Sequence, residues 1–455
     1  MSRPMGASVS KPASKPVDRP MDRQVLERRR FLAGAGGASV AAGLVSVGSM
    51  ACGRQGAQAP AAPAVITRDT ELLVWLNDHG PDVQQWIQNE LLPKFKQEQP
   101  RITVNIKWEN WSGVAERLNA VFAAGSAPDV FTGGAEWVGS LAIKKQSLDI
   151  TSYVKSWGQA GDFTESSMAA TMMGGKHYGV PVLSDARTLV YRKDLFRAAG
   201  LNPEKGPSTW EELLDWGRRL TRTEGNAITV AGYGMTTNWS SWCAYMYQAG
   251  GDYVNPQGTK ATVDTPAGLD WATFIWDVYH KFKLVEPKGP PGSFENGAQA
   301  MTESGPGVGL AMQRAGVLEH LGIPDPTRRK QQKTSVFTNW LTISTQTRNP
   351  DAAWKFIEFY TRAEHLETFH RLRGTIPPRK SLQQQPYVKD NPVFRRFAEI
   401  AAQFGRAFTP SCAWTDFRQL LIDFNKELAE KQVPPKQTLP ELEKQMAQAI
   451  ALCAA

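Results

Sequence analysis

Two polar segments near the start of the globular part follow strand-like apolar runs, where they could hold a ligand. Asn77, Asp78 and His79 come directly after TELLVWL, and residues 132–137 (TGGAEW) come after PDVF. In a sheet of parallel strands, ligands bind beyond the carboxyl ends of the strands. A third polar segment, SDAR at 184–187, separates two further apolar runs. Its carboxylate and guanidinium groups can exchange hydrogen bonds with a polar molecule.

The chain lacks the residue patterns that mark common catalytic and cofactor sites. It contains no glycine-rich phosphate loop, no HExxH and no GxSxG. Its six histidines are dispersed, and His365 and His370 are five residues apart, a spacing that does not put both on one face of a helix. We therefore expect no enzymatic activity, no metal site and no cofactor.

Hydrophobic periodicity indicates the elements that would position the polar segments. Residues 70–78 and 102–108 have the pattern of strands, and residues 83–100 lie between them with helical periodicity. An amphipathic helix beginning at Val114, a turn at Gly125-Ser126 and a third strand after Pro128 follow. Strands and helices that alternate at this spacing predict a parallel, doubly wound sheet.

The polar segment at 184–187 lies between strand-like runs at 178–183 and 188–191, and a helix is expected after Asp194. A second helix should begin at Ser208 or Thr209, because Glu211 or Glu212 in its first turn would complete a capping box.

Residues 1–51 have the features of an export signal. The arginines at 28–30 with Phe31-Leu32 resemble the twin-arginine signal. SMAC at 49–52 resembles a lipobox, and we therefore expect lipidation of Cys52. Ser49 stands where leucine is usual, and ordinary cleavage after an alanine is the alternative. Residues 52–66 are rich in Ala, Pro, Gln and Gly and indicate a flexible tether. These features predict an exported, lipid-anchored protein in the periplasm or at the outer face of the cell membrane.

Charge and length narrow the remaining classes of protein. The formal charge is +8, but residues 1–51 carry eight basic and three acidic side chains, which leaves 44 basic minus 41 acidic, about +3, for the rest. No concentrated basic stripe occurs, so a nucleic-acid partner is not expected. Roughly 385 globular residues exceed one ordinary core and predict two lobes.

Three further cysteines follow Cys52: Cys243, Cys412 and Cys453. An oxidising compartment permits a disulfide between Cys243 and Cys412, with buried free thiols as an equal alternative.

Several longer stretches together resemble one protein family. They are GSAPDVF at 125–131, YGVPVLSDARTLVYRKDLF at 178–196, STWEEL at 208–213, SFENGAQAMTESGPG at 293–307, SVFTNWLTISTQTRNPDAAWKFIEFYT at 335–361, RGTIPPRKS at 373–381 and TPSCAWTDFRQLL at 409–421. In this order they are similar to the extracellular solute-binding proteins of the maltose-binding type, the sugar-capturing components of ABC importers. The resemblance covers nearly all of the chain after about Thr67.

The resemblance implies the α/β, periplasmic-binding-protein type II fold, with two lobes that are discontinuous in sequence and each built on a doubly wound sheet. The N-terminal lobe would comprise residues 67–182 and 336–390, and the C-terminal lobe residues 183–335 and 391–455. The chain would cross between the lobes near 182–186, near 334–336 and around Asp390.

The resemblance also implies a cleft between the lobes in which carboxylates and aromatic rings contact a sugar. Asp185 and Trp414 match family positions where an acid accepts sugar hydroxyls and a ring stacks on the sugar. The other expected contacts are Trp137, Trp239, Trp242, Trp340, Asn77, Glu136, Asn238 and Arg373. The alternative role for the tryptophans is packing within a lobe. Asp185 could instead pair with Arg187 or cap a helix, and Arg373 could instead fix a loop by bonding backbone carbonyls. Gly305-Pro306-Gly307 replaces the family's Gly-Pro-Trp, so one aromatic plate is absent.

We interpret the chain as a monomeric, membrane-tethered receptor that binds a carbohydrate and delivers it to the transmembrane subunits of an ABC permease. Binding of an anionic solute such as a glycerophosphodiester is an alternative, in which Arg187, Lys176 or Arg373 would hold the ligand. An exported glycan-active or cofactor-bearing enzyme is a further alternative, but no motif fixes the separation of a carboxylate pair such as Asp185 and Glu136.

Overall fold

The computed structural model describes residues 63–431 and 433–454. The expected export signal at 1–51, the lipidation site Cys52 and most of the expected tether therefore lie outside the described residues. Within the described part of the chain, no helix combines the length and the apolar character needed to cross a bilayer.

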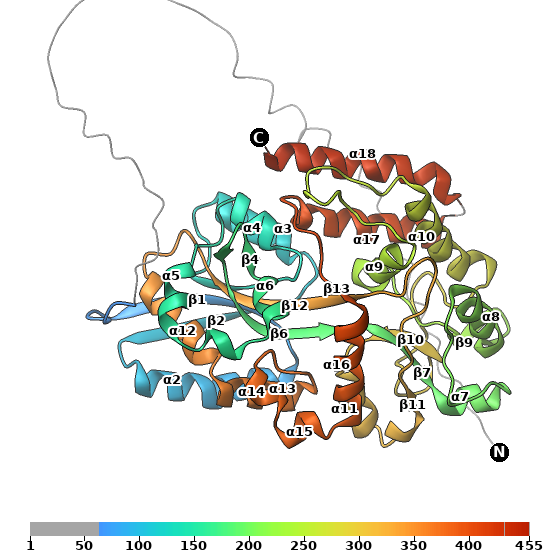
Figure 1. Cartoon of the computed structure of the whole chain (residues 1–455), viewed down its shortest axis with the longest axis horizontal. Coiled ribbons are helices and arrows are strands. Elements are labelled where there is room, and N and C mark those ends of the chain that lie inside the picture. Colours follow the sequence, from blue (N-terminus) through green and yellow to red (C-terminus); the bar gives the residue numbers. More distant parts are fainter. Residues whose placement is uncertain (1–62, 432, 455) are drawn as a thin grey trace, which may run out of the picture. The chain divides into compact units, whose positions relative to one another are not determined.

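A six-stranded mixed sheet takes its strands from widely separated parts of the chain, between residues 70 and 406 (Figure 1). Its order is β13-β12-β3-β1-β2. Strand β6 also pairs with β12, through residues 336 to 341. The bounds of these strands are Thr70–Asn77 for β1, Ile102–Glu109 for β2, Val130–Gly133 for β3, Val180–Ala186 for β6, Thr334–Ile343 for β12 and Gly405–Arg406 for β13. Strand β1 is parallel to both β2 and β3, which confirms the parallel arrangement expected for the first three strands.

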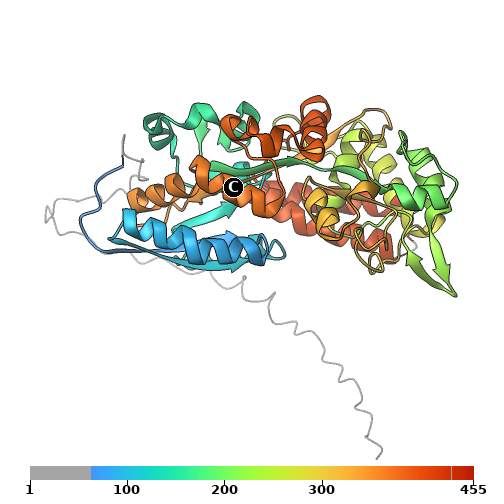
Figure 2. The same cartoon turned by 90° about the horizontal axis from the view of Figure 1, so that it is seen from below.

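The helical connection between β1 and β2 runs from α1 (Pro81–Trp86) through the π-helical turn η2 (Ile87–Leu91) to α2 (Leu92–Glu98). Figure 2 shows it alongside the strands of the sheet. Pro81 occupies the first helical position, where its missing N–H is not needed. Val83, Ile87, Leu91 and Phe95 are buried at intervals of four, so one stripe of the helix faces the sheet.

The second sheet is smaller and consists of three antiparallel strands, in the order β10 (Met301–Ser304), β7 (Thr188–Arg192) and β11 (Leu321–Gly322). It therefore differs from the doubly wound sheet expected in each lobe, because both neighbours run against β7. Only Arg187 separates the end of β6 from the start of β7, so the chain passes from the first sheet to the second almost without interruption.

Helices surround both sheets, and the strand pairs β4–β5 and β8–β9 form two separate two-stranded sheets. Around the first sheet lie α3 (Val114–Ala123), α4 (Val138–Ile143), α5 (Thr151–Trp157), η3 (Ala160–Asp162), α6 (Glu165–Ala169), β4 (Met172–Met173), β5 (Lys176–His177), α12 (Pro350–Tyr360), α13 (Ala363–Arg373), α14 (Lys380–Gln383) and α15 (Pro386–Lys389). The others are α7 (Lys193–Ala198), α8 (Trp210–Leu220), β8 (Arg222–Glu224), β9 (Ala227–Val230), α9 (Trp239–Gln248), α10 (Pro266–Trp276), η4 (Asp277–Lys281), α11 (Val308–Arg314), η5 (Leu318–His320), α16 (Pro392–Phe404), α17 (Trp414–Glu430) and α18 (Pro435–Ala454).

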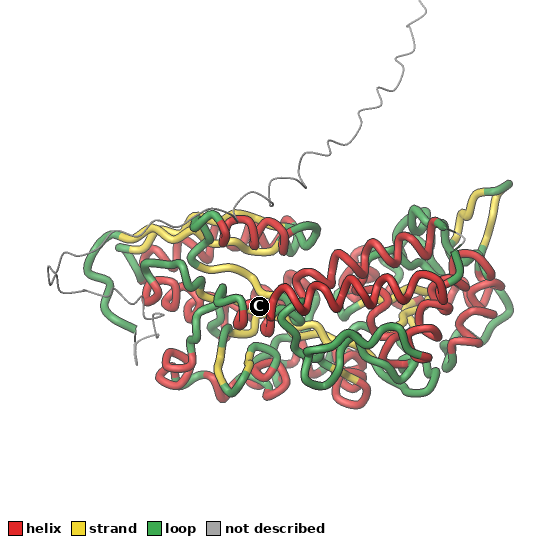
Figure 3. The backbone as a smooth tube through the Cα atoms, turned by 90° about the horizontal axis from the view of Figure 1, so that it is seen from above, coloured by secondary structure: helices red, strands yellow, loops and turns green. Residues whose placement is uncertain are grey.

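Two large groups of buried apolar residues correspond to the two sheets. The first core packs Leu72, Val74 and Ile343 of the six-stranded sheet against α12. The second core joins Leu189 and Tyr191 of β7 to α8, α9, α10, α17 and α18. In Figure 3, the β8–β9 hairpin extends from the body as a pair of yellow strands at the right. The fold is thus α/β with two lobes, and the expected lobe boundaries fall within β6, within β12 and between α15 and α16.

Local predictions around the polar segment at 184–187 are met in part. Residues Ser184 to Ala186 continue β6 instead of forming a break, because they pair with residues Thr338 to Val336 of β12. The helix expected after Asp194 is α7. The start of α8 confirms the capping box: the Thr209 hydroxyl accepts the Glu212 N–H at 3.1 Å, and the Glu212 carboxylate accepts the Ser208 N–H at 2.7 Å.

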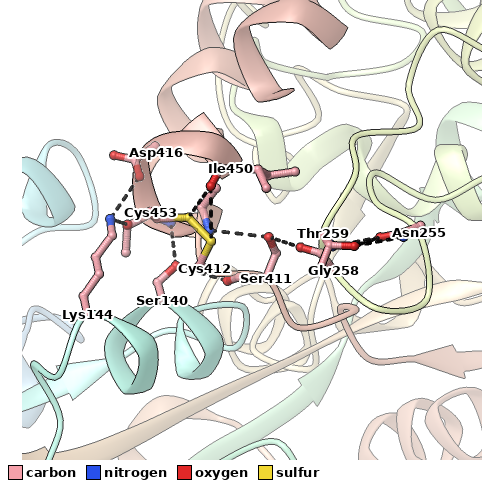
Figure 4. Close-up of a disulfide and its surroundings, with 12 residues drawn as sticks. Ser140, Lys144, Asn255, Gly258, Thr259, Ser411, Cys412, Asp416, Ile450 and Cys453 are labelled. Carbon is pink, nitrogen blue, oxygen red and sulfur yellow. Dashed lines mark hydrogen bonds and ion pairs between the residues drawn. A yellow bond between two sulfur atoms is a disulfide. The ribbon is translucent and has the colours of Figure 1, made fainter. Parts of the chain in front are cut away.

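The disulfide joins Cys412 to Cys453, with a Cα–Cα distance of 5.9 Å, so the permitted pairing of Cys412 with Cys243 is wrong (Figure 4). Helices α17 and α18 form a hairpin that returns Cys453 to the residues just before α17. Cys243 is a buried free thiol whose sulfur lies 3.2 Å from the Ser335 hydroxyl.

Trp340 of β12 is fixed between two glycine backbones. A Cβ on Gly133 would lie 2.4 Å from its indole, and a Cβ on Gly179 would lie 2.1 Å from the ring and 2.8 Å from the Leu341 carbonyl oxygen. The indole N–H donates to the Gly134 carbonyl oxygen at 2.8 Å. The ring therefore acts as a spacer between β12 and the neighbouring backbone.

Gly179→Ala should lower the free energy of unfolding by about 1–3 kcal/mol, because overpacking forces the ring or strand to shift. Gly161→Ala is the matched control, since a Cβ there meets nothing within 4 Å. Urea unfolding of both variants measures the difference. Equal stability of the two would contradict this account of the spacer.

Candidate functional site

A polar cavity of about 360 Å³ lies where the first sheet meets the second core. It is approached by the carboxyl ends of all three parallel strands, because Asp78 follows β1, Trp111 follows β2 and Glu136 follows β3. The expectation that a site would form beyond these strand ends thus matches the geometry. The other polar and aromatic residues of the wall are Asp185, Arg187, Thr236, Asn238, Trp239, Ser240, Ser241, Phe337, Asn339, Arg373 and Arg418.

Strands β6 and β12 supply the floor of the cavity. Leu183, Asp185 and Arg187 lie at alternate positions and face it, as do Phe337 and Asn339. The intervening residues Ser184, Ala186, Val336 and Thr338 line a larger cavity of about 640 Å³, which Asp185 also borders. The two strands therefore separate a cavity rich in charged side chains from one lined mostly by apolar residues.

Asp185 is the central carboxylate of the polar cavity. Burial raises its pKa from 3.8 to about 6, against the opposite pull of the Arg187 and Arg373 guanidiniums. Among the described residues no donor forms a hydrogen bond with this carboxylate. Both of its oxygens can therefore accept hydrogen bonds from a bound molecule.

The two arginines beside Asp185 are held by other groups. Arg187 donates to the Ser240 hydroxyl at 3.0 Å, and its guanidinium lies 4.7 Å from the centre of the Phe337 ring. Arg373 donates to the His79 carbonyl oxygen at 3.4 Å, while its buried Nε finds no acceptor within the described part of the chain. Each arginine is thus oriented yet retains donor capacity.

Arg418 of α17 lies among three tryptophans at the opposite wall. Its guanidinium is 5.3 Å from the ring centre of Trp111, 5.2 Å from that of Trp137 and 5.7 Å from that of Trp239. It donates to the Trp111 carbonyl oxygen at 3.2 Å and lies 3.6 Å from a carboxylate oxygen of Glu136. Its buried Nη1 has no partner among the residues that the structure describes.

Glu136 is the second buried acid of the site, at 4% exposure. Burial raises the pKa of its carboxyl, although the neighbouring Arg418 guanidinium acts in the opposite direction. The pair forms a contact between the first sheet and the second core at the cavity wall.

The structure brings half of the predicted ligand contacts to this cavity: Glu136, Asp185, Asn238, Trp239 and Arg373. Asn77 is buried and absent from the cavity lining, and its backbone N–H donates to the Thr132 hydroxyl at 3.2 Å. Asn238 also caps α9 by accepting the Ser240 N–H at 3.0 Å.

Trp137, Trp242, Trp340 and Trp414 are 0% exposed and absent from the cavity lining. The indole N–H of Trp414 donates to the Thr409 carbonyl oxygen at 2.7 Å, and its ring contacts Phe408 and Phe417 edge-on. Trp242 likewise donates to the Thr236 carbonyl oxygen at 2.7 Å. These four rings occupy the packing role that the sequence left as their alternative.

Sequence reasoning missed Trp111, Asn339 and Arg418. Trp111 lies beyond the carboxyl end of β2, so the rule applied to the first and third strands would also have found it. Arg418 follows Trp414 by four residues and shares its face of α17. Asn339 had no sequence signal beyond its place in an apolar strand.

His365 and His370 are part of the packing of α13. His370 bonds through its two ring nitrogens to the Thr375 hydroxyl at 2.8 Å and to the Val182 carbonyl oxygen at 3.0 Å. In residues 63–431 and 433–454, no group of three or more His, Cys, Asp or Glu side chains is arranged to hold a metal ion.

Asp185→Asn should stabilise the protein more at pH 8 than at pH 5. Because the folded-state pKa is raised, protonation of Asp185 favours the folded state, and that contribution is lost as the pH rises through about 6. Asparagine cannot ionise and avoids the loss. Thermal midpoints at both pH values measure the effect, with the exposed Asp423→Asn as control. A midpoint difference that is the same at both pH values would contradict the prediction.

The model of the bacterial extracellular solute-binding protein family matches residues 78–366, more than half of the chain. The diacetylchitobiose binding protein DasA of Streptomyces coelicolor is 24% identical over 328 residues, which cover 69% of this chain and 74% of DasA.

Two solved structures share the fold. A solute binding protein of an ABC transporter from Thermotoga lettingae, bound to alpha-D-tagatose, has a TM-score of 0.74 at 20% identity and covers 84% of this chain and 100% of its own. The substrate-binding protein Lmo0181 from Listeria monocytogenes, in complex with cycloalternan, has a TM-score of 0.74 at 21% identity and covers 84% and 99%. The family match, together with the cavity between two α/β lobes, shows that the chain belongs to the bacterial extracellular solute-binding proteins.

Proposed function

We propose that this protein captures a carbohydrate in the polar cavity and delivers it to the transmembrane subunits of an ABC importer, without chemical conversion. The observation that carries the proposal is the mixture of unused donors and acceptors on the cavity wall. Asp185 offers acceptors only, Arg418 offers a donor only, and the Asn339 amide offers both. Hydroxyl groups donate and accept, so a polyhydroxylated ligand can satisfy all of them.

The balance of charge favours a neutral ligand over an anionic one. The wall contains three guanidiniums, those of Arg187, Arg373 and Arg418, and three carboxylates, those of Asp78, Glu136 and Asp185. A phosphate would enter a site without surplus positive charge. Lys176, considered for an anionic ligand, instead pairs with Asp149 at 3.0 Å and is absent from the wall. Capture of an anionic solute therefore ranks second.

Aromatic side chains provide the second requirement of a carbohydrate site. Trp111 and Trp239 line the cavity, and Trp111 is only partly buried. The C–H faces of a sugar ring can pack against such planes. DasA and the two structural neighbours, named for diacetylchitobiose, tagatose and cycloalternan, support this ligand class. A Cβ on Gly305 would lie 3.2 Å from the Asp185 carboxylate, so the residues that replace the family's Gly-Pro-Trp border the acid closely.

The proposal includes the cellular setting predicted from the sequence. The protein would be exported through its twin-arginine signal, acylated at Cys52 and held by the tether in the periplasm or at the outer face of the cell membrane. It would act as a monomer, bind no nucleic acid and require no cofactor.

Asn339→Ala should weaken ligand binding about tenfold, because one lost hydrogen bond costs ~1–1.5 kcal/mol. Its stability should be unchanged, since the Asn339 side chain forms no hydrogen bond with other described residues. Tryptophan fluorescence and calorimetry would be recorded with tagatose, diacetylchitobiose, cycloalternan and sn-glycerol 3-phosphate. Asn226→Ala, in the exposed turn between β8 and β9, is the control.

The pattern of responses separates the candidate functions. Binding of one sugar that Asn339→Ala weakens and Asn226→Ala does not would support the proposal. A response to the phosphate ester alone would favour the anionic alternative, and conversion of any probe would contradict a purely binding role.

A further inference from the structure

The segment from Ser411 to Arg418 carries contacts from the second core to the first sheet. We call it the seam. The Ser411 carbonyl oxygen accepts from the Ser140 hydroxyl of α4 at 3.3 Å, and the Thr415 N–H donates to that hydroxyl at 3.3 Å. Lys144, at the end of α4, donates at 3.0 Å to the Asp416 carboxylate (Figure 4). It also donates at 3.0 Å to the Thr415 hydroxyl. The seam ends at Arg418 in the cavity wall.

The backbones of the seam and α4 approach so closely that only glycine fits between them. A Cβ on Gly139 would lie 2.8 Å from the Ser411 carbonyl oxygen and 2.9 Å from its nitrogen. On its other side, Ser411 donates from its hydroxyl to the Gly258 carbonyl oxygen at 2.8 Å. Ser411 is therefore held in a narrow space, and a small displacement of its backbone would separate it from Ser140.

The disulfide is attached directly to this narrow space. Cys412 follows Ser411, and its partner Cys453 is 41 residues later, at the end of α18 (Figure 4). Leu439, Leu442, Met446 and Ile450 bury the inner face of α18 in the second core. The disulfide thus connects the seam to a helix that is anchored independently of the first sheet.

We propose that the Cys412–Cys453 disulfide positions the seam against α4, and that its reduction by a dithiol loosens this attachment while both cores remain folded. In the reduction the protein S–S bond breaks, the dithiol loses two electrons and two protons to form its own disulfide, and Cys412 and Cys453 become thiols. The loosened seam would also shift Arg418 and weaken retention of the ligand, a consequence that rests on the proposed function.

The environments of the three cysteines make this response selective. Cys453 is only partly buried, so a thiolate can approach it at the end of α18. Cys243 is 1% exposed and burial raises the pKa of its thiol to about 12, so it neither attacks the disulfide nor exchanges with it.

Amide hydrogen exchange of the full chain, before and after treatment with dithiothreitol, tests the proposal without a ligand. The readout is α4, including the Leu141 N–H that donates to the Trp137 carbonyl oxygen at 2.9 Å. Reduction and the double variant Cys412→Ala/Cys453→Ala should each speed α4 exchange about tenfold or more, as expected for a local opening. Gly139→Ala, which displaces Ser411 with the disulfide intact, should do the same.

Met446→Ala is the matched control, because it loosens the packing of α18 but leaves the disulfide and seam contacts in place. It should speed exchange in α18 and leave α4 unchanged. Faster exchange in α18 with unaltered exchange in α4 after reduction would overturn the proposal. If the double variant does not fold, reduction of the folded protein with dithiothreitol is the test that remains. Failure of every sugar to bind would instead count against the proposed function alone.

Discussion

Strands β6 and β12 pair antiparallel, with Asp185 opposite Phe337 and Leu183 opposite Asn339. Because side chains alternate along a strand, this ladder directs Asp185, Phe337 and Asn339 to the polar cavity and their neighbours to the larger one, which Asp185 also borders. Ser184 and Thr338, at intervening positions on the two strands, bond to each other at 3.0 Å. A slip of one residue would exchange the two sets and expose Val336 to the arginines. Correct pairing of these strands is therefore a condition for the site.

The site is maintained at a cost to stability. A buried donor without a partner costs about 1–3 kcal/mol, and Arg373 and Arg418 each have one. The surrounding aromatic packing offsets this cost, since Trp239 contacts both Phe408 and Trp414. Groups that are unfavourable for folding and retained in one cavity are typical of a place where a ligand supplies the missing bonds. Binding and stability therefore oppose each other at these residues.

Periodicity in the sequence predicted the elements near the site better than the directions of their side chains. The run from Thr70 to Asn77 is a strand, and its polar end leads to the cavity, because the rule for parallel sheets depends only on chain direction. Trp414 is the first residue of α17, and the family resemblance implied that its ring contacts a ligand. The ring instead packs in the second core. The sequence could not determine this rotation, because it depends on Phe408 and Phe417 from other segments or turns.

The disulfide and Arg418 escaped prediction for a similar reason. Cys412 and Cys453 approach each other only after α17 and α18 have packed as a hairpin, and nothing in their spacing distinguishes that pairing from one with Cys243. Asp185, by contrast, was identified because it lies in the stretch at 178–196, which resembles the family in sequence. Residues with a local signal were found, whereas residues defined by tertiary contacts were not.

The glycine-flanked ring of Trp340 has an evolutionary consequence. Residues 133, 179 and 340 share one small volume, so a change of size at one of them is costly while the other two stay the same. A relative with a smaller residue at position 340 has room for side chains at the two glycine positions, and a relative that retains the indole must retain both glycines. The three positions should therefore covary as a unit among homologues, although 46 and 161 residues of chain separate position 179 from the other two.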